Sequence, residues 1–129
     1  MSGVVHFEIP ADDAARAREF YSAAFDWRLD PLPELGYTSV VTTPVDEATQ
    51  APLEPGAING GMFERSGDLA HPIITVDVDD IDVALERIVG LGGAVVQAKT
   101  AIAGLGYFGY FRDTEGNVIG LWTTAVDAA

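Results

Sequence analysis

The first residues of the chain alternate between apolar and polar side chains. In residues 4–10 (VVHFEIP), Val5, Phe7 and Ile9 fall on one side, and His6 and Glu8 fall on the other. Alternation with a period of two is typical of a strand with one buried face. The pattern therefore predicts a strand that ends near residue 10.

A helix is predicted directly after this strand. Asp12 and Asp13 are candidate N-caps, because a carboxylate at that position accepts a backbone N–H of the first turn. Apolar residues then recur at helical spacing and form one stripe: Ala14, Ala17, Tyr21 and Ala24. The segment 11–25 is therefore expected to be an amphipathic helix.

The same order of patterns returns in residues 71–93 (HPIITVDVDDIDVALERIVGLGG). Alternating apolar positions are again followed by an acidic pair, Asp79 and Asp80, which we interpret as helix capping. The second helical stripe consists of Ile81, Ala84, Ile88 and Leu91. Placing His6 on Ile73 aligns the first strand, the acidic pair and the helix of the two halves, which indicates an internal repeat.

Three short strand-like runs follow each predicted helix. They are WRL, YTSVVTT and AINGGMF in the first half, and AVVQAK, YFGYFRD and NVIGLW in the second. We therefore predict an α+β protein with one domain, residues 1–129, built from two βαβββ modules at about 3–64 and 70–125. The modules are expected to form a curved mixed sheet around a cleft, with the helices on the outer faces.

Composition narrows the classes of function. There is no cysteine, which excludes disulfides, thiolate zinc sites and cysteine nucleophiles. A formal net charge of −13 opposes binding to nucleic acid or to an anionic membrane surface. The N-terminus has neither a basic leader nor a long apolar stretch, so we expect a soluble, cytoplasmic protein.

The two modules resemble the vicinal oxygen chelate superfamily of glyoxalase I, bleomycin-resistance proteins and extradiol dioxygenases. The resemblance rests on VVHFEIPADD…FY, on ITVDVDDIDVALERI…LGG and above all on YFRDTEGNVIGLW. It covers nearly the whole chain and is nearest to the small bacterial glyoxalase-related branch. It implies the paired-module fold and a homodimer.

In metal-dependent members of this superfamily, each module supplies ligands from its first and last strands. The resemblance carries these positions to His6, Ile73 and Gly120, and to Gly60 with an uncertainty of one residue. Only His6 has a ligating side chain, and one imidazole does not hold a catalytic ion. We therefore expect no cofactor. The alternative is a divalent metal at a rearranged site.

Such a rearranged site would combine His6 with other donors of the same strands. The candidates are His71, which lies two residues before Ile73, together with Glu8 or Asp77. His71 would have to reach about 6–7 Å along the strand from the family position. We therefore favour a place for His71 at the strand end or the rim of the cleft.

The cleft between the modules is the predicted ligand site, because concave sites are where small molecules usually bind. Strand alternation and the aromatic GYFGYF run give its expected lining: His6, Glu8, Ile73, Thr75, Tyr107, Tyr110, Val118 and Trp122. For Trp122 a core role is an equal alternative. Phe108, Phe111 and Trp27 are interpreted as core residues.

The predicted function is binding of a small organic molecule, cationic or aromatic, without a catalytic metal. The alternative is an enzyme, either a lyase or isomerase or a dioxygenase-like protein, with His6 and Glu8 as an acid–base pair. In that pair, the carboxylate is expected to raise the proton affinity of the imidazole. A third interpretation is that His6 and Glu8 are a buried polar pair that satisfies itself.

Overall fold

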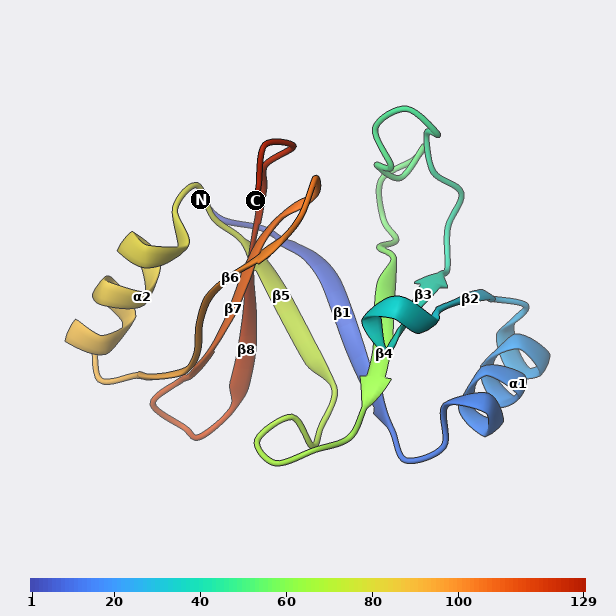
Figure 1. Ribbon diagram of the computed structural model, residues 1–129, viewed down its shortest axis with the longest axis horizontal. Coiled ribbons are helices and arrows are strands. Elements are labelled where there is room, and N and C mark those ends of the chain that lie inside the picture. Colours follow the sequence, from blue (N-terminus) through green and yellow to red (C-terminus); the bar gives the residue numbers. More distant parts are fainter. The chain divides into compact units, whose positions relative to one another are not determined.

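The computed structural model describes all 129 residues and divides into two compact units. Unit 1 comprises residues 1–5 and 73–129, and unit 2 comprises residues 6–72. The elements of both units are labelled in Figure 1. Each unit is described below by itself.

Unit 2 has the βαβββ order that the sequence predicts. Its elements are β1 (Val4–Ala11), whose first two residues are assigned to unit 1, α1 (Ala14–Phe25), β2 (Arg28–Leu32), the 3₁₀ helix η1 (Pro33–Leu35), β3 (Tyr37–Val41) and β4 (Gly60–Glu64). The strand order is β2-β3-β4-β1, in which β1 and β4 are parallel and the other pairs are antiparallel. Pro31 lies within β2, which is tolerated because β2 is an edge strand.

The core of unit 2 lies between α1 and one face of its sheet. Asp13 begins the helix, and its carboxylate accepts the backbone N–H of Arg16 at 3.0 Å. Ala17 and Tyr21 then lie one turn apart on the face that packs against the sheet. The buried side chains of this core are Ala11, Val40 and Met62, with Phe7, Trp27 and Leu29 packed around them.

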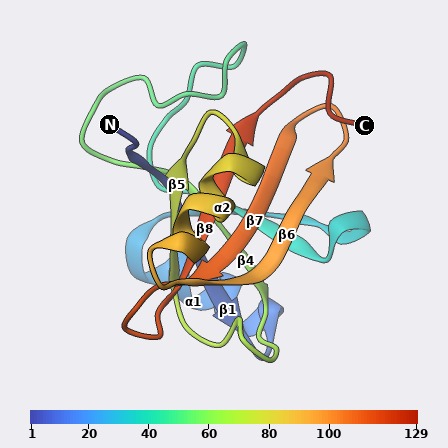
Figure 2. The same ribbon diagram turned by 90° about the vertical axis from the view of Figure 1, so that its left-hand side faces the viewer.

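Unit 1 repeats this order. It contains β5 (Ile73–Asp77), α2 (Ile81–Gly90), β6 (Ala94–Ile102), β7 (Gly106–Arg112) and β8 (Val118–Thr124), with strand order β5-β8-β7-β6. Figure 2 shows α2 lying across the strands of this sheet. Asp80 caps α2 by accepting the backbone N–H of Val83, as the sequence predicts. Ile81, Leu85 and Leu121 form the buried core under the helix.

The fold class is confirmed as α+β, with two helices and a mixed set of parallel and antiparallel strands. The helices have 12 and 10 residues. Neither is long and apolar enough to cross a lipid bilayer.

Candidate functional site

The register of β1 and β4 shows which residues lie on each face of the unit 2 sheet. Phe7 pairs with Gly60, and Glu8 pairs with Gly61. Paired residues of neighbouring strands point to the same face, and successive residues point to opposite faces. Phe7 and Gly60 therefore belong to the core face under α1, whereas His6, Glu8 and Gly61 lie on the opposite face.

Tyr37 connects the two predicted residues on this opposite face. Its hydroxyl donates to Glu8 Oε2 at 2.8 Å and lies 3.0 Å from His6 Nε2. His6 is partly buried, and the Glu8 side chain is buried, with 7% of its surface exposed. The three side chains form one hydrogen-bonded chain.

Sequence reasoning missed Tyr37. Its place depends on the register of β3 beside β4, where Tyr37 pairs with Phe63 and Ser39 pairs with Gly61. The ring then lies diagonally over Gly61. The one signal in the sequence is the pair of glycines in INGG, since a glycine inside a strand marks a close approach by another group.

Gly61 leaves the space that the Tyr37 ring fills. A β-carbon at position 61 would overlap the Tyr37 hydroxyl and the adjoining ring carbons. Under the repeat, Glu8 corresponds to Thr75, and Thr75 pairs with Gly120. The counterpart of Gly120 on the His6 face is therefore Gly61, which corrects the assignment to Gly60 within its one-residue uncertainty. Gly60 instead faces the Phe7 ring, 2.7 Å from where its β-carbon would lie.

Burial controls the protonation of His6. It lowers the pKa of the imidazole below its ordinary value of 6.5, and the Glu8 carboxylate opposes this shift without cancelling it. This corrects the expectation that Glu8 raises the proton affinity of His6, because the cost of desolvating a charged ring is the larger effect. The shift therefore favours the uncharged imidazole at neutral pH.

The lowered pKa predicts how stability depends on pH. Below pH 6.5 and down to the native pKa, the unfolded chain binds a proton at His6 that the folded chain does not bind. The free energy of unfolding should therefore fall as the pH falls through this window. Urea unfolding at pH 7.5 and 5.5 should show a larger loss for the wild type than for His6→Gln. Equal losses would contradict the prediction.

In unit 1, the sheet face away from α2 carries most of the other predicted residues. Thr75 and Tyr110 both pair with Gly120, and Trp122 pairs with Phe108. Strand alternation adds Ile73 and Val118 to this face. Ile73, Thr75 and Tyr110 are buried, and Trp122 is partly buried, with its indole N–H donating to Thr124 at 2.8 Å.

Two aromatic residues of β7 lie on the opposite side from the one predicted. Tyr107 packs against the core under α2, and the Lys99 ammonium lies 4.3 Å from its ring centre, so Tyr107 does not share the face of Trp122. Phe108, predicted as core, lies opposite Trp122 and 5.9 Å from the Tyr110 ring. The GYFGYF run is apolar on both faces, so alternation alone does not assign it. The core roles of Phe111 and Trp27 are confirmed.

Thr75 accounts for the missing side chain at Gly120. A β-carbon at position 120 would lie 2.7 Å from Thr75 Oγ1, which is closer than van der Waals contact allows. Tyr110 is the direct cross-strand neighbour on the other side. Gly120 therefore lies beside two larger side chains on the same face.

The donor set does not fit a divalent metal ion. The side chains at Ile73, Gly61 and Gly120 offer no ligating atom, and no three His, Asp or Glu side chains are grouped so that they could hold an ion. The candidates for a rearranged site, His71 and Asp77, are both exposed. His6 and Glu8 are instead linked through Tyr37.

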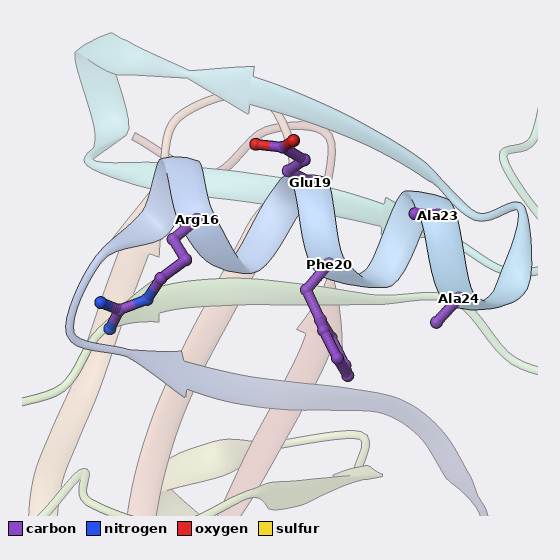
Figure 3. Close-up of a pocket in the computed structure, with 5 residues that line it drawn as sticks. All are labelled: Arg16, Glu19, Phe20, Ala23 and Ala24. Atoms are coloured by element: carbon purple, nitrogen blue, oxygen red, sulfur yellow. The ribbon is translucent and has the colours of Figure 1, made fainter.

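A shallow pocket runs along α1, lined by Arg16, Glu19, Phe20, Ala23 and Ala24 (Figure 3). All five residues come from one helix and are exposed. None of them belongs to the predicted site. A single helix face surrounds too little of a small molecule to form a typical binding site, which usually encloses most of its ligand.

Comparison with known proteins shows which family the chain belongs to. The model of the Glyoxalase/Bleomycin resistance protein/Dioxygenase superfamily matches residues 3–121. The chain belongs to this superfamily. A curated member, "Putative glyoxylase CFP32" of Mycobacterium tuberculosis (strain CDC 1551 / Oshkosh), is 30% identical over 121 residues. That match covers 89% of this chain and 43% of the relative, so the chain spans less than half the length of this superfamily member.

Solved structures of the superfamily fold are similar over almost the whole chain. Hypothetical protein BH1468 from Bacillus halodurans C-125 has a TM-score of 0.63 and 13% identity, covering 99% of this chain and 98% of that one. Methylmalonyl-CoA epimerase from Mycobacterium tuberculosis has a TM-score of 0.60 and 15% identity, covering 95% and 88%. At these identities, the likeness establishes the fold.

Proposed function

We propose that the chain binds a small organic molecule at the sheet face of His6, Tyr37 and Glu8, and that binding needs no catalytic metal. The supporting observation is the donor set: the superfamily's ligand positions outside His6 fall on residues without donor atoms. What is left on this face is an uncharged imidazole, a phenol and a buried carboxylate, which suits hydrogen bonding better than coordination.

Charge narrows the class of ligand. The Glu8 carboxylate is buried on this face, and the whole chain carries a formal net charge of −13. Both favour a cationic or hydrogen-bonding ligand over an anionic one. The Tyr37 ring lies on the same face and is partly buried, which supports a ligand with aromatic groups.

A screen by thermal shift tests this proposal. The compounds would be cationic and aromatic metabolites and antibiotics, bleomycin among them. A ligand at a hundredfold excess over its Kd stabilises the folded state by about 2.7 kcal/mol. We expect at least one compound to raise the Tm of the wild type, and expect the rise to be lost in Glu8→Gln but kept in Glu34→Gln, which changes an exposed carboxylate of the same unit.

Two results would contradict binding at this face. One is that no compound stabilises the wild type. The other is that every stabilising compound acts equally on Glu8→Gln and on the wild type.

The homodimer implied by the family resemblance stays a prediction, which light scattering of the purified chain would check.

A second candidate function is proton transfer by His6. The imidazole is uncharged at neutral pH, and Tyr37 links it to a carboxylate, the arrangement in which a third group orients a base and stabilises its protonated form. A proton would move from the ligand to His6, and Glu8 would balance the new charge. The methylmalonyl-CoA epimerases on the same fold are consistent with an enzyme.

A further inference from the structure

The hydrogen bonds of the Tyr37 hydroxyl determine where the protons of this face lie. A tyrosine hydroxyl has a single hydrogen, and an ionised carboxylate only accepts. Tyr37 gives its hydrogen to Glu8 Oε2 at 2.8 Å, so it has none left for His6 Nε2 at 3.0 Å. The second contact is a hydrogen bond only if Nε2 carries a hydrogen and donates to the Tyr37 oxygen.

This arrangement leaves the other ring nitrogen, Nδ1, with a lone pair. In a neutral imidazole one nitrogen donates and the other accepts. Nδ1 has no hydrogen-bond partner within the protein, and no buried side-chain nitrogen or oxygen lacks one. Nδ1 is therefore not fully buried, and its lone pair is not used by another group of the protein.

We infer that Tyr37 is a positioning residue that fixes His6 as the Nε2–H tautomer and presents Nδ1 as an acceptor. The ligand expected at Nδ1 is a molecule with an O–H or N–H donor. An anion or an ether oxygen has only lone pairs to offer, and these would be repelled by the lone pair of Nδ1. The inference rests on the proposed function in one respect, namely that the ligand binds at this face.

Gly61 makes this arrangement possible. The Tyr37 ring occupies the space directly over its backbone, where any side chain would displace the hydroxyl. The positions of Tyr37 and Gly61 are set by the register of β3, β4 and β1 rather than by flexible loops. The pairing of the strands therefore fixes the orientation of the imidazole.

Nuclear magnetic resonance of the ligand-free protein, labelled with ¹⁵N-histidine, tests the tautomer at pH 7.5. The chain has two histidines, so His71, which is exposed, serves as the internal reference. We expect His6 to be entirely Nε2–H, with that hydrogen protected from exchange. In Tyr37→Phe, which keeps the ring, exchange should be roughly 5- to 10-fold faster, the loss expected for one hydrogen bond.

Tyr107→Phe is the matched control, because it removes a tyrosine hydroxyl from the opposite face of the unit 1 sheet. It should leave both histidine signals unchanged. An Nδ1–H tautomer in the wild type would overturn the inference. So would an Nε2–H exchange rate that is the same in Tyr37→Phe and the wild type.

Two small probes test the ligand class. Phenol and anisole have nearly the same shape, but only phenol has a donor hydrogen. We expect phenol, and not anisole, to shift the Nδ1 resonance of His6. Equal shifts, or no shift with either probe, would overturn the assigned class. The tautomer is measured without ligand, so it can be confirmed even if the compound screen finds no ligand. Equally, the screen can find a ligand even if the tautomer is not the one inferred.

Discussion

Gly61→Ala is expected to destabilise the protein by about 2–4 kcal/mol. The new β-carbon would overlap the Tyr37 hydroxyl and ring, so the tyrosine has to leave its place. Its hydrogen bonds to Glu8 and His6 are then lost, and the buried carboxylate loses a donor. Urea unfolding followed by circular dichroism measures the change.

Gly90→Ala is the matched control, since a β-carbon there meets no atom within 4 Å and position 90 ends α2. It should be neutral or slightly stabilising, because alanine is the better helix residue. In a Tyr37→Ala background the cost of Gly61→Ala should shrink, because the overlapping ring is gone. A full cost in that background would show that the close approach is not its cause.

Met62→Ala is expected to cost about 2–5 kcal/mol, the range for removing a large buried side chain and leaving a cavity. Met62 has 1% of its surface exposed and packs with Ala11 and Val40 between α1 and the sheet. It follows Gly61 in β4 and points to the other face. Urea unfolding of the variant measures the loss.

Met62→Leu keeps the volume and should cost less than about 1.5 kcal/mol. The His6 resonances of Met62→Leu should match those of the wild type, because Met62 lies on the core face. If Met62→Ala cost no more than Met62→Leu, the side chain would not fill the core as the structure shows.

The fold could be predicted from the sequence because the same patterns occur twice. Alternation in residues 4–10 and 73–77, and an acidic cap before each helix, all agree with the observed elements. Each of these signals is local, so it does not depend on which strands become neighbours. The predicted cleft depends on how the two units are placed, and it stays a prediction.

The site was only partly predictable, because its contacts depend on register. His6 and Glu8 share a face by alternation alone, whereas Tyr37 joins them through β3 and β4, about 30 residues later in the chain. The pKa of His6 is lowered, although the neighbouring carboxylate had predicted that it would be raised. A neighbouring carboxylate is visible in the sequence, but the extent of burial is not.

The aromatic run of β7 shows the limit of alternation. Tyr107 and Phe108 are adjacent and both apolar enough for either face, so periodicity does not say which one packs under α2. Pairing with β8 decides it, since Phe108 is opposite Trp122 and Tyr110 is opposite Gly120.

We propose that this member of the superfamily works without a bound metal, and metal content tests this proposal most directly. Untagged protein would be incubated with nickel, zinc, iron(II) or manganese, desalted, and measured by elemental mass spectrometry. We predict far less than one ion per chain for every metal, in the wild type and in His6→Ala alike. Close to one ion per chain in the wild type, abolished in His6→Ala, would contradict the claim and identify a rearranged metal site.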